Sequence, residues 1–297
     1  VDDVKASELL KAYEGSDIKL LAGCAPCQTF SSYNQKADSS DDRWWLLLQF
    51  ARLVKETRPE IVTMENVPGL IEQDVFQTFL DALSAQGYFV TYKIVNCAEY
   101  GLPQQRNRLV LLASQLGEVS LLPPNQFGKK TRSVRDAIAK LPLISAGIAH
   151  ETDPLHQSSA LSEKNLRRIR VSKPGGTWRD WPKELVADCH KKETGKTYPS
   201  VYGRMNWDDP APTITTQFFG FGNGRFGHPE QDRAISLREG AILQSFPKRY
   251  KFTAPGQPVS KKVLGRLIGN AVPVRLGEVI GKSIHDHVSR HRDLLNE

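Results

Sequence analysis

Short apolar runs alternate with amphipathic stretches between residues 18 and 114. Four runs predict strands, at residues 18–22, 61–64, 88–95 and 109–113. Between them, apolar residues recur at helical spacing over residues 43–55 and 75–83, which predicts two helices. Strands that alternate with helices are typical of βαβ units, so this part of the chain predicts an α/β fold with a mostly parallel sheet.

The pattern changes after Pro123 and Pro124. Glycine, proline and basic residues become frequent, and apolar periodicity stays weak until about residue 211. We therefore expect a domain boundary near residue 124. A last helix is predicted from Val274 to about His287, directly after Pro273.

Composition narrows the class of protein. The net charge of +7 permits a polyanionic partner without requiring one, and the four cysteines are too few and too unevenly spaced for a disulfide framework. No stretch of about 18 apolar residues and no signal peptide is present. These features predict a soluble, cytoplasmic protein with reduced thiols and no membrane association.

Basic and aromatic residues are interleaved between residues 126 and 205. Phosphate and base contacts would use such a mixture, but a solvated surface explains it equally well. Nucleic acid binding stays open from this feature alone.

Cys27 lies just after the first predicted strand, where open α/β sheets place their sites. Cys24-Ala25-Pro26-Cys27 admits three interpretations: a redox pair, half of a zinc site, or a lone nucleophile beside an incidental Cys24. No second C-x-x-C or H-x₃₋₅-H completes a zinc site, so we expect no metal. The polar run that follows Cys27, up to Asp42, predicts a long loop where a redox motif would begin a helix, and such a loop is suited to act as a lid.

Charged residues follow at two more strand ends. Glu65 ends the second strand, so its carboxylate is expected in the same crevice as Cys27, although a helix cap or a solvated loop is the commoner role for such a residue. Arg106 and Arg108 precede the fourth strand at i and i+2, where they could hold an acidic or carbonyl group, or simply lie in solvent.

Five segments together make a resemblance specific. In chain order they are Pro26-Cys27-Gln28, Glu65-Asn66-Val67, residues 104–108, residues 237–247 and Gly269-Asn270-Ala271-Val272-Pro273. Their order and spacing resemble those of the DNA (cytosine-5) methyltransferase family, of the bacterial restriction-modification type. The resemblance implies a Rossmann-like catalytic domain at residues 1–124, a target-recognition domain at 125–259, and a return to the catalytic domain at 260–297.

The resemblance also implies a mechanism. Cys27 would attack C6 of a flipped cytosine, protonated Glu65 would engage N3 and the exocyclic amine, Arg108 would hold O2, and Arg106 would position the cysteine loop and the base. Further DNA contacts are expected from Gln28, Ser31, Ser32, Arg204 and Arg225.

The implied cofactor is S-adenosyl-L-methionine, with contacts expected from Asp3, Val4, Pro26, Leu46, Asn270 and Val272. The family's first strand, its glycine-rich turn and its ribose-binding acidic residue do not match this sequence. We therefore expect the rest of the pocket to lie upstream of Val1 or on a second chain. Gly222-Asn223-Gly224-Arg225-Phe226-Gly227 fits the G-x-G-x-x-G pattern, but His228-Pro229 follows where a helix should begin, so tight turns are expected there.

Two other functions stay open at this point. A tRNA cytosine-5 methyltransferase would share this active site, and a catalytically silent DNA-binding fragment would suit an incomplete cofactor pocket. The leading hypothesis is a methyltransferase acting on double-stranded DNA.

Overall fold

The computed structural model describes residues 3–24, 45–127, 131–254 and 256–295. These residues form two compact units. The first comprises residues 1–96, 107–127 and 278–297, and the second comprises residues 97–106 and 128–277. The chain passes from one compact unit to the other after residues 96, 106, 127 and 277. The boundaries of the catalytic and target-recognition domains, expected near residues 124 and 259, stay predictions.

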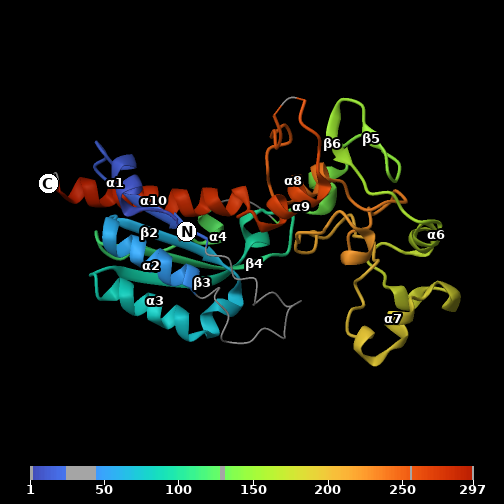
Figure 1. The fold of residues 1–297 in the computed structure, drawn as a ribbon, viewed down its shortest axis with the longest axis horizontal. Coiled ribbons are helices and arrows are strands. Elements are labelled where there is room, and N and C mark those ends of the chain that lie inside the picture. The colour runs from blue at the N-terminus through green and yellow to red at the C-terminus, as the bar shows by residue number, and fades with distance from the viewer. Residues whose placement is uncertain (1–2, 25–44, 128–130, 255, 296–297) are drawn as a thin grey trace. The chain divides into compact units, whose positions relative to one another are not determined.

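The first unit is a three-layer α/β structure (Figure 1). Its elements are α1 (Ala6–Ala12), β1 (Leu20–Gly23), α2 (Trp45–Thr57), β2 (Ile61–Asn66), the 3₁₀ helix η3 (Pro68–Glu72), α3 (Asp74–Ser84), β3 (Phe89–Asn96), β4 (Asn107–Ser114), α4 (Pro124–Phe127) and most of α10 (Val274–Leu295). Each predicted strand and helix in this range is confirmed within a few residues, and the last helix runs eight residues further than expected.

The sheet has the strand order β1-β2-β4-β3. β1 pairs with β2 in parallel, but β4 is antiparallel to both β2 and β3. The prediction of a mostly parallel sheet is therefore wrong as far as pairing is concerned: β1, β2 and β3 run in one direction, and β4 is inserted against them. The physical reason is the connection, because a parallel neighbour needs a long crossover, usually helical, and none lies between β3 and β4.

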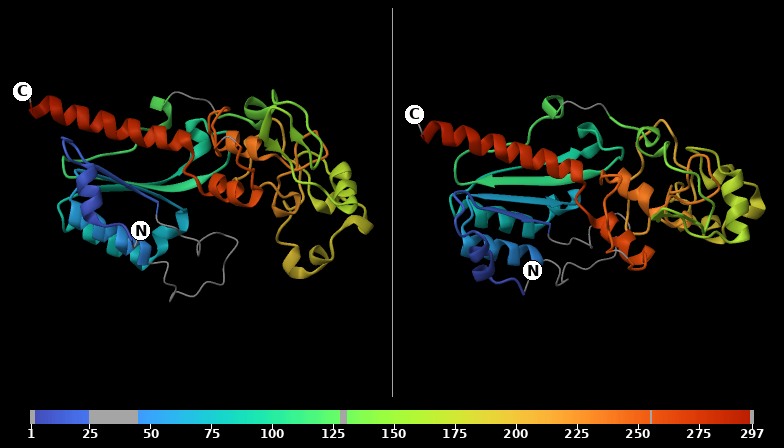
Figure 2. Two further views of the ribbon diagram at one scale, coloured as in Figure 1. Left: turned by 45° about the horizontal axis from the view of Figure 1, so that its top comes forward. Right: turned by 90° about the horizontal axis from the view of Figure 1, so that it is seen from above.

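Alternate side chains of the sheet face two different helical layers. Val62, Met64, Leu109 and Leu111 pack with α2 and α3 in one apolar core. On the opposite face, Ser114 bonds to His287 of α10 at 2.8 Å, and Figure 2 shows α10 on that side of the sheet. β2 is buried along its whole length, including its polar residues Thr63, Glu65 and Asn66.

The second unit contains little regular structure. Its elements are η4 (Cys97–Tyr100), α5 (Val134–Ile138), β5 (Ala149–His150), β6 (Asp153–Gln157), α6 (Glu163–Val171), η5 (Trp178–Asp180), η6 (Lys183–Leu185), α7 (Asp188–Lys191), η7 (Glu193–Gly195), η8 (Phe221–Asn223), α8 (Leu237–Leu243), α9 (Lys261–Asn270) and the start of α10. Its main core gathers around Phe218, Leu237 and Leu243. The G-x-G-x-x-G segment contains η8 and isolated bridges, without the strand and helix of a dinucleotide-binding unit.

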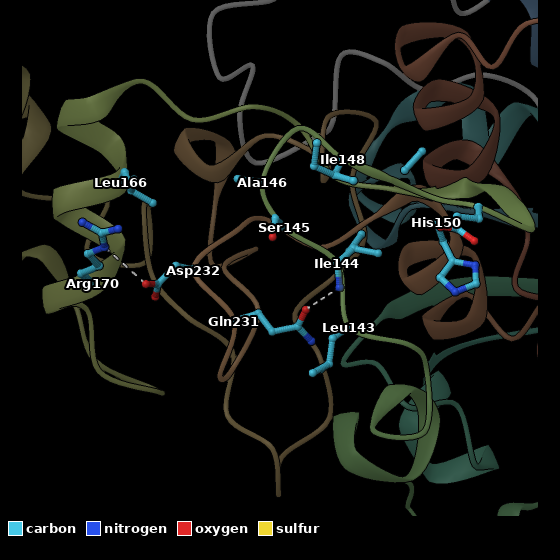
Figure 3. Close-up of a pocket in the computed structure, with 12 residues that line it drawn as sticks. Leu143, Ile144, Ser145, Ala146, Ile148, His150, Leu166, Arg170, Gln231 and Asp232 are labelled. Carbon is cyan, nitrogen blue, oxygen red and sulfur yellow. Dashed lines mark hydrogen bonds and ion pairs between the residues drawn. The ribbon is translucent and has the colours of Figure 1, made fainter.

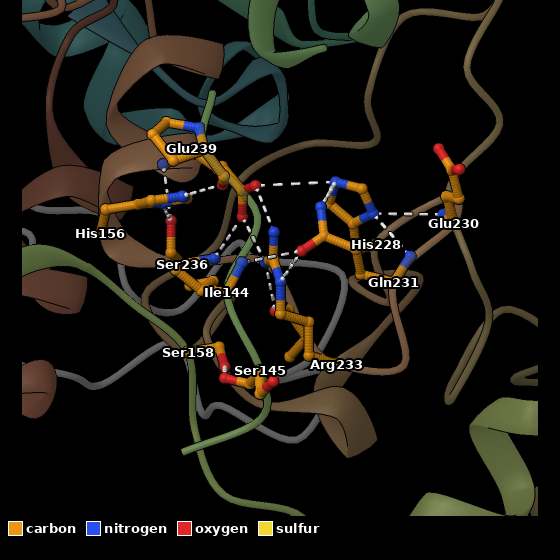
Figure 4. A network of polar contacts seen from close by, with 12 residues as sticks. Ile144, Ser145, His156, Ser158, His228, Glu230, Gln231, Arg233, Ser236 and Glu239 are labelled. Atoms are coloured by element: carbon orange, nitrogen blue, oxygen red, sulfur yellow. Dashed lines mark hydrogen bonds and ion pairs between the residues drawn. The ribbon is translucent and has the colours of Figure 1, made fainter. Parts of the chain in front are cut away.

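A buried network organises α8 (Figure 4). Arg233 and Glu239 are almost completely buried and pair through two contacts of 2.7 and 2.8 Å. Ser236 begins the helix with a capping box in which Glu239 accepts the Ser236 N–H. Burial alone would raise the pKa of Glu239, but hydrogen bonds and charge from Arg233 outweigh it and lower the pKa.

Close packing at Gly240 gives a test of this core. A Cβ at this position would lie 2.0 Å from the Phe218 ring, so Gly240→Ala is expected to lower the free energy of unfolding by ~1–3 kcal/mol. Gly281 in α10 is the matched control, because nothing lies within 4 Å of its Cβ position and Gly281→Ala should stabilise the helix by up to ~1 kcal/mol. Urea denaturation of both variants measures the difference, and equal stabilities would contradict the packing.

Candidate functional site

Glu65 and Arg108 meet at the carboxyl edge of β1 and β2. Glu65 lies opposite Val110 in the β2–β4 register, so Arg108, two residues earlier on β4, is its diagonal neighbour on the same face. Arg108 Nε lies 2.8 Å from Glu65 Oε1, and the two side chains are only 13% and 10% exposed. Two charged residues that follow or precede different strands thus form a mostly buried ion pair.

Cys24 leaves the same edge one residue after β1. Desolvation of its thiol and the neighbouring Glu65 carboxylate raise the pKa of Cys24 to about 11, while a backbone hydrogen bond from Glu65 and the charge of Arg108 act in the opposite direction. At neutral pH this thiol stays protonated, and a protonated thiol is a poor nucleophile. The electrostatics of this edge therefore disfavour Cys24 as the attacking group of either a redox pair or a transferase.

Arg106 belongs to the second unit. It is 2% exposed, and its guanidinium donates to the carbonyls of Ile214 and Gly269, both at 3.1 Å. Both carbonyls belong to the same unit as Arg106. The role expected for Arg106 in positioning the cysteine loop stays a prediction, because that loop lies outside the described residues. Arg106 fixes the chain around Gly269, next to Asn270.

Gln104 and Gln244 extend this network, and sequence reasoning did not assign either residue a role. Gln104 Oε1 accepts the Ile214 N–H at 2.7 Å, and its Nε2 donates to Gln244 Oε1 at 3.1 Å. Gln244 Nε2 donates to the carbonyl of Ile268 at 2.8 Å. Both side chains are fully buried. The sequence offered one signal for a role of these residues, which is that each lies in one of the five motifs. Buried amides are normally paired, and here each amide pairs with backbone groups and with the other amide.

The predicted cofactor residues divide between the units. In the first unit, Asp3 is exposed, while Val4 and Leu46 are half-buried at the edge of the apolar core. The carbonyl of Val4 accepts a 3.2 Å hydrogen bond from Arg52, which lies on the same helix as Leu46. In the second unit, Asn270 is exposed and Val272 is half-buried. Pro26 and Cys27 lie outside the described residues.

Of the five residues predicted to contact DNA, the structure describes Arg204 and Arg225. Gln28, Ser31 and Ser32 lie outside the described residues. Arg204 is 5% exposed and bonds to the carbonyls of Ile169, Ser172, His228 and Gln231 and to Asp232. Such a guanidinium stabilises the fold and is not presented to a phosphate. Arg225 is half-buried, donates to the Gly176 carbonyl, and has its pKa lowered by desolvation.

The interleaved basic and aromatic segment is partly internal. Trp178 and Trp181 are 6% exposed and form a small core with Leu185. Buried Arg168 lies over the rings of Trp181 and Tyr202, with 5.7 and 5.1 Å between Cζ and the ring centroids. These aromatic rings pack in the interior of the segment. Four basic side chains of the segment are exposed: Arg167, Arg170, Lys173 and Arg179.

A separate depression in the second unit is lined by apolar residues of 143–149, by Leu166 and Arg170 of α6, and by Gln231 and Asp232 (Figure 3). None of the predicted site residues lines it. Among the described residues, no cluster of three or more metal-ligating side chains occurs, and no helix is both long and apolar enough to span a membrane.

The pKa of Cys24 can be tested by alkylation. With a pKa of about 11, about 0.1% of the thiol is ionised at pH 8, so carboxymethylation should be slow there and should accelerate as the pH approaches 11. Glu65→Gln removes the neighbouring negative charge and should shift the rate profile to lower pH. Mass spectrometry of the Cys24 peptide follows the reaction, and a rate that levels off near pH 9 would contradict the assignment.

Comparison with known proteins adds to this geometry. Residues 2–286 match the family described as C-5 cytosine-specific DNA methylase. The chain is 52% identical over 287 residues to the Type II methylase M.HgiDII of Herpetosiphon aurantiacus, covering 96% of this chain and 80% of that protein. It is 34% identical to the Type II methyltransferase M1.BsuMI of Bacillus subtilis, covering 88% of this chain and 59% of that protein.

A solved structure supports the fold independently. The crystal structure of a prophage-encoded protein of Escherichia coli aligns with 99% of this chain and 86% of its own, with a TM-score of 0.66 and 23% identity. This confirms the predicted methyltransferase-type α/β fold. The family match over almost the whole chain confirms the resemblance carried by the five motifs and the class of enzyme it implies: the chain belongs to the C-5 cytosine-specific DNA methylase family.

Proposed function

We propose that the protein transfers a methyl group to C5 of cytosine in double-stranded DNA, as the modification enzyme of a bacterial restriction-modification system in the cytoplasm. Support comes from the family, from relatives named as Type II methylases, and above all from the Glu65–Arg108 pair at 2.8 Å. The comparisons do not favour tRNA methylation or a catalytically silent fragment.

Cys27 is the proposed nucleophile. It follows Cys24 by three residues in the sequence, and Cys24 is the first residue after β1. The Cys27 thiolate adds to C6 of the flipped base, and the electron pair moves toward C5, which then accepts the methyl group. Removal of the C5 proton and elimination of the Cys27 sulfur complete the reaction.

Glu65 and Arg108 are the proposed groups that bind the base. In the structure, Arg108 Nε lies 2.8 Å from Glu65 Oε1. When Arg108 turns to O2 of the cytosine, Glu65 loses its contact with the guanidinium, takes up a proton from solvent and engages N3 and the exocyclic amine. The cytosine thus takes the place of Arg108 beside Glu65 and the place of Glu65 beside Arg108. Glu65 can therefore exchange a proton with the cytosine only when the cytosine is in the pocket.

The residues present suit S-adenosyl-L-methionine. The half-buried apolar side chains of Val4 and Leu46 could flank an adenine ring, and the exposed Asp3 carboxylate could accept from its amine. Pro26, Asn270 and Val272 are the other proposed contacts, of which Pro26 lies outside the described residues. When bound, the cofactor supplies an electrophilic methyl group on a sulfonium. Arg106 acts as a positioning residue through the carbonyl of Gly269.

Trapping with a suicide substrate tests the nucleophile. Duplex DNA with 5-fluorocytosine at the target position should form a covalent complex with the full-length protein and S-adenosylmethionine, because fluorine blocks the final elimination. Cys27→Ser should abolish the complex, whereas Cys24→Ser, the matched control, should leave it intact. Equal trapping by Cys27→Ser, or loss only in Cys24→Ser, would refute the assignment. tRNA in place of duplex DNA should yield no methyl transfer.

Glu65→Gln tests the base-binding pair. The amide can donate a hydrogen bond but cannot transfer a proton to N3, so methyl transfer should slow by about 10²–10⁴-fold. DNA affinity measured by fluorescence anisotropy should change little, because the substitution removes one contact within the flipped-base pocket. An unchanged transfer rate would exclude Glu65 from the chemistry.

A further inference from the structure

The short link between α9 and α10 carries two proposed cofactor contacts. α9 ends at Asn270 and α10 begins at Val274, so only Ala271, Val272 and Pro273 join them. Asn270 is exposed, Val272 is half-buried and Pro273 is buried. The direction in which this link presents its side chains depends on how its two ends are held.

Polar side chains hold the end of α9. The last carbonyls of a helix lack partners within the helix and must find them elsewhere. Here the Ile268 carbonyl accepts from Gln244 Nε2 at 2.8 Å, and the Gly269 carbonyl accepts from Arg106 at 3.1 Å. The positive guanidinium also opposes the negative end of the helix dipole. A Cβ on Gly269 would lie 2.4 Å from the Thr215 carbonyl oxygen, so the helix end is confined on this side as well.

Ser245, the next residue after Gln244, holds the start of α10. Its Oγ accepts the backbone N–H of Arg275 at 2.9 Å and donates to the Gln244 carbonyl at 2.6 Å. Arg275 Nε in turn donates to the Tyr100 carbonyl at 3.0 Å. The first N–H groups of a helix are otherwise unpaired, so this serine caps α10 from a distant part of the sequence.

The backbone of Ser245 is strained. Its φ is +64°, a left-handed conformation that serine rarely adopts and that glycine adopts readily. Such strain persists where surrounding contacts enforce it, and it gathers at functional positions. The left-handed turn places the Gln244 side chain on α9 and the Ser245 hydroxyl on α10.

We propose that Gln244 and Ser245 form a clamp that sets the geometry of the link from Asn270 to Pro273, and that they are positioning residues for cofactor binding. Gln104, bonded to Gln244, supports the clamp from the segment that also carries Arg106. The cofactor half of this proposal rests on the proposed function, whereas the clamp rests on the hydrogen bonds alone.

Ser245→Ala and Ser245→Gly separate positioning from stability. Both remove the hydroxyl, but only glycine relieves the left-handed strain, so the glycine variant should be the more stable of the two in urea denaturation. Both should weaken binding of S-adenosylhomocysteine about 5- to 10-fold, as loss of one hydrogen bond implies. Ser260→Ala is the matched control, because it removes a capping hydroxyl at the other end of α9 and should leave this affinity unchanged.

Two measurements on the full-length protein decide the proposal. Amide hydrogen exchange without ligand should speed up at residues 271–275 in both Ser245 variants, and isothermal titration should show the common loss of S-adenosylhomocysteine affinity. Unchanged exchange at these residues would overturn the clamp. Faster exchange with unchanged affinity would keep the clamp but overturn its cofactor role. No binding by the unsubstituted protein would count against the proposed function itself.

Discussion

The guanidinium of Arg106 is almost completely buried, and a buried cation is tolerated only where acceptors surround it. The carbonyls of Ile214 and Gly269 meet this requirement, because both accept hydrogen bonds from the Arg106 guanidinium. The same rule operates at Arg204, which gathers four carbonyls and a carboxylate, and at Arg233, which pairs with Glu239. The second unit has few strands and short helices, so buried arginines provide the cross-links that a sheet would otherwise provide.

The sequence pattern predicts the positions of helices and strands in the first unit, but not the direction of every strand. Helices α2 and α3 each bury one face, so apolar periodicity locates them well. β2 is buried on both faces, and it is located by the short, mostly apolar run at residues 61–64. The direction of β4 could not be read in this way, because apolar content is the same for parallel and antiparallel pairing. It is determined by the short connection from β3, which makes no helical crossover.

The candidate site was predictable for a different reason. Glu65 and Arg108 lie at strand ends, and strand ends share an edge, so their proximity follows from the order of elements. Arg204 was misjudged because an arginine's environment is invisible in sequence: the same side chain can bind a phosphate or close a loop. Gln104 and Gln244 were overlooked because their role depends on contacts between segments about 140 residues apart.

Burying arginines also changes what the charge of the protein means to a polyanion. The formal charge of +7 counts every cation equally, yet Arg106, Arg168, Arg204, Arg233 and Arg238 are directed into the protein. Only cations that reach phosphates displace the condensed counterions of DNA and make affinity depend on salt. The salt sensitivity of DNA binding should therefore report a smaller, peripheral set of lysines and arginines, and it should be weaker than the composition alone suggests.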